Sequence, residues 1–310
     1  MEIKNTEFVK AGNRILPKPN GTDYKLINGK AYDLKWDDWS NTAYMVENGE
    51  LNLPAKIYEL EEDKIFKKRV LNNFNKHDNS VGVMLAGTKG TGKTMLAKII
   101  AKESNLPIII VDTNFPSGRL IGFFKQFTTP VCVIFDEIEK NFNTGRMLDF
   151  LDGVEKTTKK LVLMTCNELN QVSEYLQDRC SRIRYVRKYG IADNLAFLPM
   201  LIESKEIKNG EEVRKFVEER FKLPSIDNMN SFLNEVKDLE DENISLDDIV
   251  KYMNINTNAP VSNPSNNTSN TKAESTEDDT TESECPKVIE GIFGDAFYDD
   301  NDDAEYENAA

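Results

Sequence analysis

The sequence predicts an α/β fold in which a doubly wound parallel sheet is covered by helices on both faces. Short, almost continuously apolar runs alternate with helical stretches from Val81 onward, a pattern typical of buried parallel strands. A glycine-rich loop at 87–94 joins the first apolar run to the first helical stretch. These two observations favour a βαβ arrangement whose ligand site lies at the carboxyl ends of the strands.

The expected elements follow one another regularly along this part of the chain. Strands are expected at Val81–Leu85, Pro107–Val111, Val131–Phe135, Leu161–Thr165 and Ile183–Val186. Apolar residues at helical spacing predict helices at 57–74, 94–104, 117–127, 144–152 and 170–177.

Composition divides the chain into four segments. Residues 1–55 form an N-terminal extension, irregular or β-rich, that we expect to pack on the main α/β domain at 56–189. Amphipathic helices at 196–198, 213–221, 229–236 and 246–253 predict a small helical lid over 190–255. Residues 256–310 are rich in Asn, Ser, Thr, Pro and acids, so we expect a disordered acidic tail.

The net charge of −14 comes almost entirely from this tail. From residue 257 onward the chain has 14 acidic and two basic residues, which leaves 39 acidic and 37 basic residues before it. The body therefore lacks the positive field of a tight nucleic-acid binder; such a partner is possible but is not indicated by charge.

Other compositional features exclude several kinds of chemistry. The four cysteines show no metal-ligand spacing, and the single histidine, His77, lies in a polar turn, which argues against a Ser-His-Asp mechanism or a histidine-ligated zinc. No apolar run reaches the roughly 18–20 residues that cross a bilayer. The first residues lack the apolar core of a signal peptide, so we expect a cytoplasmic protein without membrane contact.

The loop after the first strand predicts a triphosphate site. It matches G-x-x-x-x-G-K-[ST] at every fixed position, and its residues are Gly87, Thr88, Lys89, Gly90, Thr91, Gly92, Lys93 and Thr94. Glycines let backbone N–H groups and the helix N-terminus face an anion. Lys93 would meet the β- and γ-phosphates, and Thr94 would offer its hydroxyl to Mg²⁺. The strand–loop–helix context favours this interpretation over a glycine-rich turn that matches by coincidence.

An acidic pair follows the third expected strand. Asp136 and Glu137 come directly after Val131–Phe135, at the strand end where ligands bind in such sheets. Asp136 would hold Mg²⁺ through water, and Glu137 would polarise the water that attacks the γ-phosphate. Paired acids also cap helices, but their occurrence one strand along from the phosphate loop favours the catalytic interpretation.

With these motifs the chain resembles the AAA+ ATPases, and three further segments extend the resemblance over about 55–255. Residues 148–153 look like the L-x-x-[LM]-D-G helix end, 161–167 resemble the strand that ends in the sensor-1 asparagine, and 176–183 resemble L-x-x-R-x-G-R-[FI]. The resemblance implies ATP and Mg²⁺ as ligands, Asn167 as the residue that orients water, and Arg179 and Arg182 as arginine fingers for a neighbouring subunit. In related enzymes such fingers raise the rate of hydrolysis roughly 10³–10⁵-fold.

The resemblance has its own departures and implications. Ser181 stands where the family usually has glycine, and a solvated basic stretch remains an alternative for the two arginines because Arg184, Arg187 and Lys188 follow. The best fit is the AAA group with paired R-x-x-R fingers. The compact length and the sequence Asp136–Lys140 look like bacteriophage-encoded members, which would place the protein in a bacterial host cell. The family forms rings, usually of six subunits.

The sequence leaves the output of the ATPase open. The aromatic pore loop of AAA unfoldases has one candidate, Phe115, in a short segment between two strands, and no arginine in 190–255 matches a sensor-2 position. We expect an oligomeric machine that remodels a protein or nucleoprotein. The alternatives are a nucleotide-controlled assembly or recruitment module that works through the tail, or a replication-linked loader. Aromatics among acids at 288–300 predict a docking motif, although a purely solvating tail is equally consistent.

Overall fold

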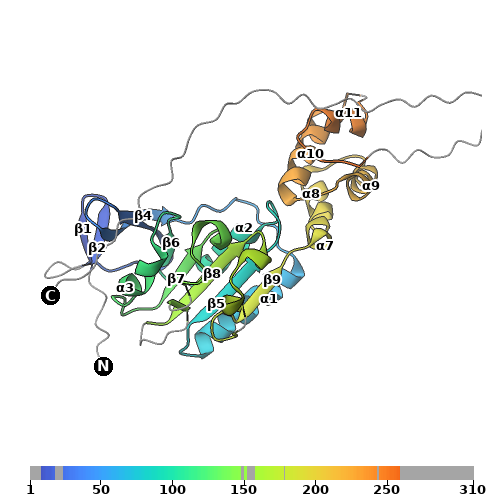
Figure 1. The fold of residues 1–310 in the computed structure, drawn as a ribbon. Helices are drawn as coiled ribbons and strands as arrows, with labels where there is room; N and C mark the ends of the chain where they lie inside the picture. Colours follow the sequence, from blue (N-terminus) through green and yellow to red (C-terminus); the bar gives the residue numbers. More distant parts are fainter. Residues whose placement is uncertain are drawn as a thin grey trace, which may run out of the picture. The chain divides into compact units, whose positions relative to one another are not determined.

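The computed structural model describes residues 8–17, 24–147, 150–151, 158–177, 179–242 and 244–258 (Figure 1). The expected acidic tail, apart from its first residues 256–258, lies outside the described residues together with its docking motif and most of the segment 148–153. None of the described helices is long and apolar enough to cross a membrane.

A parallel sheet forms the centre of the main domain. Its strands are β5 (Val81–Ala86), β6 (Ile108–Val111), β7 (Val131–Phe135), β8 (Lys160–Cys166) and β9 (Tyr185–Lys188). They pair in parallel in the order β6-β7-β8-β5-β9. The predicted α/β fold is therefore confirmed, and the five strands differ from their expected bounds by at most two residues.

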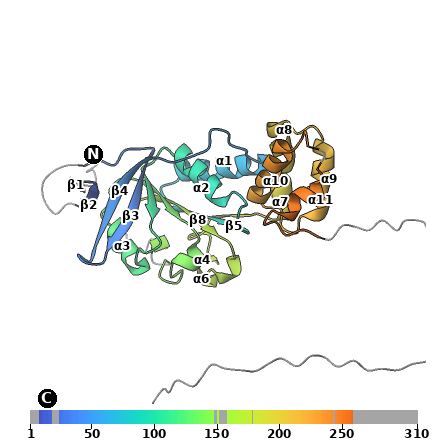
Figure 2. The same cartoon turned by 90° about the horizontal axis from the view of Figure 1, so that it is seen from above.

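Helices cover both faces of this sheet, as the continuous apolar runs require. In β5, Val81, Val83 and Leu85 belong to the core beneath α1 (Glu61–Lys76) and α2 (Lys93–Glu103), whereas Met84 and Ala86 belong to the opposite core. The opposite core contains residues of α3 (Leu120–Phe124), α4 (Ile138–Asn141) and α6 (Glu174–Gln177). Figure 2 shows these two sets of helices on opposite sides of the strands.

The N-terminal segment extends the same sheet. Strands β1 (Phe8–Ala11), β2 (Arg14–Pro17), β3 (Lys30–Asp37) and β4 (Thr42–Glu50) pair antiparallel with one another, and β3 also pairs in parallel with β6. The described strands thus form one nine-stranded sheet in the order β1-β2-β4-β3-β6-β7-β8-β5-β9. The edge of β6 is consequently paired rather than open to solvent.

Several helices differ from the sequence expectation. Helix α1 begins at Glu61 rather than Ile57, where three acidic residues occupy its first turn and interact favourably with the helix dipole. The expected helix at 117–127 is a 3₁₀ turn, η1 (Ser117–Arg119), followed by the short α3; it contains Gly118 and Gly122, which disfavour a longer helix. The expected helix at 170–177 is likewise split into η2 (Leu169–Gln171) and α6.

The segment predicted as a helical lid, called the lid below, contains short helices. Those that the structure describes are α7 (Ile191–Leu195), α8 (Leu198–Lys205), α9 (Gly210–Arg220), α10 (Ile226–Asp238) and α11 (Leu246–Lys251). Their apolar faces enclose a separate core that includes Phe197, Phe221 and Phe232. The side chains of Ser225 and Ser245 cap α10 and α11 by accepting backbone hydrogen bonds from Asn228 and Asp248.

Phe115 does not lie on a solvent-facing loop. It is 2% exposed and packs edge-on against Trp36 of β3, with ring centroids 5.8 Å apart, and against Phe123 of α3. The N-terminal strands bury this residue, so the suggestion that Phe115 is a pore-loop aromatic is wrong.

Candidate functional site

The phosphate loop connects β5 to α2 and brings backbone groups close to the lid. Gly87 has a φ of +150°, and a β-carbon there would lie 2.8 Å from the carbonyl oxygen of Tyr189. Gly90 has a φ of +73°, and its carbonyl accepts a 2.8 Å hydrogen bond from the backbone N–H of Ile226 at the start of α10. Glycine is needed at both positions because the backbone is left-handed or closely approached.

Lys93 is buried at the start of α2, and its amine is held by the loop. Nζ donates to the carbonyl oxygens of Gly87 and Thr88, each at 2.7 Å, and to Asn167 Oδ1 at 3.1 Å. Burial lowers the pKa of Lys93. A phosphate oxygen at this point would accept the same N–H groups and add an opposite charge beside the ammonium.

The loop threonines have different roles. Thr91 is almost fully buried, and its hydroxyl donates to the Thr88 carbonyl at 2.9 Å, which braces the loop from inside. Thr94 Oγ1 instead donates to Asp136 Oδ1 at 2.9 Å. Lys89 is exposed at the loop tip. Lys93 and Thr94 therefore hydrogen-bond to the acidic pair or its partners, and the charge of Lys89 adds a small contribution to the lowered pKa of Glu137.

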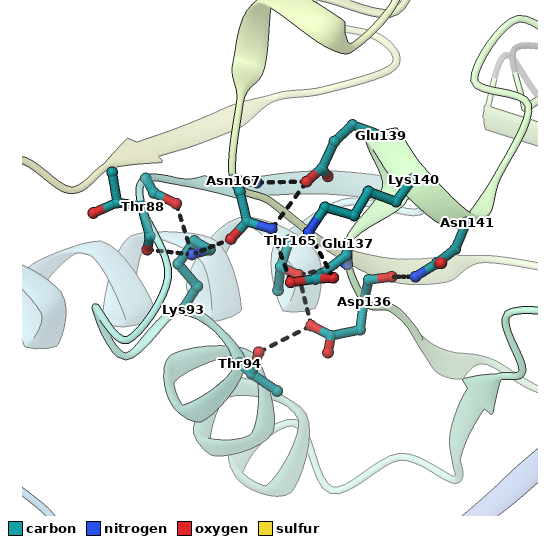
Figure 3. Close-up of polar contacts among 11 residues, drawn as sticks. Thr88, Lys93, Thr94, Asp136, Glu137, Glu139, Lys140, Asn141, Thr165 and Asn167 are labelled. Carbon is teal, nitrogen blue, oxygen red and sulfur yellow. Dashed lines mark hydrogen bonds and ion pairs between the residues drawn. The ribbon is translucent and has the colours of Figure 1, made fainter. Parts of the chain in front are cut away.

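Asp136 and Glu137 are joined by a threonine that no sequence motif singled out. Thr165, near the end of β8, donates its hydroxyl to Asp136 Oδ1 at 2.6 Å and accepts the backbone N–H of Glu137 at 2.9 Å (Figure 3). The sequence signal that could have identified Thr165 is a polar residue near the end of a buried strand, two positions before Asn167.

Glu137 is held in a defined position by both its backbone and its side chain. Its φ of +49° is left-handed, which is uncommon for a residue with a side chain and typical of sites that are fixed by their surroundings. Its Oε1 accepts from Asn167 Nδ2 at 2.8 Å, and Oε2 accepts from Lys140 Nζ at 3.0 Å. Hydrogen bonds from Asn167 and then Lys140 lower the pKa of Glu137, so its carboxylate is ionised at neutral pH.

Asn167 is the centre of the polar network shown in Figure 3. Besides Glu137, its side-chain Nδ2 and its backbone N–H each donate to Glu139 Oε1 at 3.0 Å, and its Oδ1 accepts from Lys93. No role was predicted for Glu139, the residue immediately before Lys140 in α4. One amide thus connects the ammonium of the phosphate loop to two carboxylates.

The two predicted finger arginines differ in environment. Arg179 is exposed, whereas Arg182 is 9% exposed and donates from Nη1 to the Tyr175 carbonyl. The hydrogen bonds of the single chain therefore bring together the phosphate loop, the acidic pair and Asn167. Arg182 bonds within its own segment, and Arg179 faces solvent.

A cavity of about 300 Å³ lies beside the phosphate loop, and no sequence pattern indicated it. Its walls come from the segment before α1, from the loop and α2, and from the lid; they include Tyr58, Gly92, Met95, Tyr189, Ile226 and Asp227. The mixture of aromatic and aliphatic walls with a few polar groups is suited to a planar base. A second cavity of about 440 Å³ is also lined by Gly90 and Tyr189.

A phosphate loop after β5, an acidic pair after β7 and an asparagine after β8 on one parallel sheet define a P-loop nucleoside-triphosphatase domain. Residues 83–188 match the family described as "ATPase family associated with various cellular activities (AAA)". The matched segment contains the phosphate loop, the acidic pair and Asn167.

Similar proteins include an uncharacterized AAA domain-containing protein, ycf46, of Guillardia theta, which is 28% identical over 193 residues. The peroxisomal ATPase PEX1 of Cricetulus griseus is 28% identical over 181 residues. These matches cover 51% and 50% of this chain but only 38% and 13% of the two relatives. Among solved structures, the RuvB Holliday junction branch migration motor of Thermotoga maritima aligns with a TM-score of 0.46 at 18% identity, over 62% of this chain and 68% of that one.

Proposed function

We propose that this chain binds Mg²⁺-ATP in the loop Gly87–Thr94 and hydrolyses it to ADP and phosphate, with Glu137 and Asn167 positioning the attacking water. The observation that carries the proposal is the continuous network from Lys93 through Asn167 to Glu137. It supports the proposal because the cation that would bind phosphate and the carboxylate that would act as general base contact the two ends of one amide.

The residues around Thr94 suit a magnesium ion. Thr94 Oγ1 and Asp136 Oδ1 lie 2.9 Å apart, and hydroxyl and carboxylate oxygens are the ligands that Mg²⁺ prefers. Thr94 would hold the ion directly and Asp136 through water; a bound ion would neutralise charge on the β- and γ-phosphates. Thr165 orients Asp136 for this task, because its hydroxyl donates to the same carboxylate oxygen.

The nucleotide would extend from the loop into the neighbouring cavity. The cavity of about 300 Å³ begins at Gly90–Gly92, where the loop joins α2, and is bounded by Tyr189 and by Ile226 of the lid. An adenine base there would contact both the core and the lid. Nucleotide binding would then stabilise one arrangement of the lid relative to the phosphate loop.

We further propose that catalysis needs a second copy of the chain, which lends Arg179 to the γ-phosphate of its neighbour. The exposure of Arg179 supports this role, since a finger must reach outside its own subunit. The buried Arg182 is better suited to support the segment, because it is bonded to the Tyr175 carbonyl of the same chain. A closed ring, hexameric by family resemblance, would repeat this interface.

For the output, we propose the remodelling of a protein or nucleoprotein partner without threading on Phe115. The buried position of Phe115 and the short segment between β6 and β7 support this restriction. Recruitment of a partner through the acidic tail remains the second candidate, and it would tolerate slow hydrolysis. DNA-stimulated hydrolysis would instead favour a loader.

Mixing two inactive variants tests the shared site. Lys93→Ala should lose ATP binding, and Arg179→Ala should bind ATP but lose hydrolysis. Mixed assemblies should regain part of the wild-type rate, because an intact loop then meets an intact Arg179 across some interfaces. Arg184→Ala is the matched control: this arginine is also exposed, and its loss should leave the rate unchanged. A wild-type rate for Arg179→Ala, independent of protein concentration, would exclude the shared site.

A further inference from the structure

A buried ionic cluster lies where the core meets the lid. The side chain of Arg187, on β9, is 7% exposed and its Nε donates to Asp63 Oδ1 of α1 at 3.0 Å. Its Nη2 donates to Asp193 Oδ1 of α7 at 2.7 Å, and its Nη1 donates to the Lys188 carbonyl at 2.9 Å. One guanidinium thus connects a core helix, an edge strand and the first helix of the lid.

The same cluster holds Tyr189, which forms a wall of both cavities beside the phosphate loop. The Tyr189 hydroxyl donates to Asp63 Oδ1 at 3.1 Å, and the Arg187 guanidinium lies 4.6 Å from the centre of the Tyr189 ring. The Tyr189 backbone N–H donates to the Ala86 carbonyl at 2.8 Å, immediately before Gly87. The position of the Tyr189 ring is therefore fixed on one side by the sheet and on the other by the Asp63–Arg187 pair.

Asp193 links this arrangement to the start of the lid. Its Oδ2 accepts the backbone N–H of Gly190 at 2.8 Å, so the carboxylate caps α7 while its other oxygen binds Arg187. The positive charge of Arg187 lies between the carboxylates of Asp63 and Asp193, and all three side chains are largely removed from water; the exposed Glu62 adds a 3.2 Å ion pair at the rim. Such a cluster is costly to break, because the remaining buried charges would lose their counter-charge.

We propose that Asp63, Arg187 and Asp193 form a latch that holds the first lid helix on the core. The latch also keeps Tyr189 in place as a wall of the cavity of about 300 Å³ proposed to hold the base, called the base cavity below. Arg187 and Asp193 are positioning residues that act on nucleotide affinity through Tyr189 and the lid, whereas Asp63 also lines the cavity itself. This inference rests on the proposed binding of ATP, and the latch would contribute to the affinity for the adenine base. Its loss should weaken binding of the base while the phosphate loop still binds a triphosphate.

Two ligands separate these contributions. Full-length protein is titrated calorimetrically with Mg²⁺-ATP and with Mg²⁺-tripolyphosphate, which has the phosphates but no base. Asp193→Ala should raise the Kd for ATP at least tenfold and change that for tripolyphosphate less than twofold. In steady state, the variant should show a raised KM with kcat within about threefold of wild type. Asp193→Asn, which retains an oxygen acceptor for Arg187, should recover part of the affinity.

A matched control addresses a purely structural role. Asp248 lies in the first turn of α11 and bonds the Ser245 cap, away from the base cavity. Asp248→Ala should lower the melting temperature of the lid as Asp193→Ala does, yet leave the Kd for ATP unchanged.

The possible results lead to different conclusions. If Asp193→Ala binds ATP as wild type does, or loses ATP and tripolyphosphate equally, the latch is wrong while the proposed function stands. If the wild type binds neither ligand, the proposed function fails and the latch fails with it.

Discussion

Asn167 Nδ2 lies 2.8 Å from Glu137 Oε1, and the same amide accepts a hydrogen bond from Lys93 through its oxygen. This contact lowers the pKa of Glu137, with a second contribution from Lys140. Glu137, the proposed general base, is therefore kept ionised by the residue that also contacts the phosphate-loop lysine.

Removal of the amide should change the pH dependence of hydrolysis. In Asn167→Ala, the pKa of Glu137 rises toward its ordinary value, so the acid limb of kcat/KM moves to higher pH. Because the water also loses its orienting group, kcat should fall about 100-fold. The profile is measured from about pH 4 to 8. Lys140→Ala, which removes the weaker contribution, should shift the limb in the same direction but less. An unshifted acid limb in Asn167→Ala would contradict this account.

Thr165→Val should damage the site while preserving its shape. The substitution removes the hydroxyl that donates to Asp136 and accepts from the Glu137 N–H. We expect kcat to fall about 10- to 100-fold, as for other residues that orient ligand-binding groups. The unpaired N–H should cost about 1–3 kcal/mol in the free energy of unfolding. Thr165→Ser keeps the hydroxyl and should retain most of both, as measured by ATPase assay and urea denaturation.

Replacement of glycine by alanine should have opposite effects at Gly87, which Tyr189 approaches closely, and at Gly122, which has open space. Gly87→Ala would place a β-carbon 2.8 Å from the Tyr189 carbonyl oxygen, so we expect lost ATP binding and a lower melting temperature. Gly122, inside α3, has open space where its β-carbon would lie, with nothing within 4 Å. Gly122→Ala should raise stability by about 0.5–1 kcal/mol. Wild-type binding by Gly87→Ala would show that the loop and Tyr189 are not tightly packed.

The N-terminal strands should be sensitive to acid. Hydrogen bonds from Lys30 and Tyr24 lower the pKa of Glu47 to about 2, from an ordinary 4.5. Because the folded value is lower, the stabilisation is present above pH 4.5 and is lost as the pH falls toward 2. In thermal unfolding from about pH 2 to 7, Glu47→Gln should show a flatter decline than wild type across that window. A decline in Glu47→Gln as steep as that of wild type would contradict this role of Glu47.

Phe115 should behave as a core residue. Phe115→Ala removes a buried ring between Trp36 and Phe123 and should cost about 3–5 kcal/mol in the free energy of unfolding. Phe115→Leu fills much of the same space and should keep the ATPase rate at a temperature where it is folded. Chemical denaturation and an ATPase assay test both variants. A loss of stability below about 1 kcal/mol for Phe115→Ala would indicate that the ring is not part of the core.

The sequence alone was sufficient for the contiguous parts of this protein. Two local patterns predicted the proposed ligand chemistry from adjacent residues: the phosphate loop between an apolar strand and a helix, and Asp136–Glu137 after another strand. The parallel sheet followed from runs that are apolar on both faces, and the structure confirms it. Helix limits at 57–74 and 117–127 were less predictable, because packing and glycine content decide where short helices begin and end.

Only the tertiary structure decided which distant residues meet. Thr165 contacts Asp136 and Glu137 because β7 and β8 are neighbours, and Arg187 meets Asp63 across 124 residues of sequence. Pairing of β3 with β6 placed Trp36 over Phe115 and removed that aromatic from the surface. No periodicity or spacing encodes such contacts, since they depend on strand order and on the free energy of burying side chains from separate segments against one another.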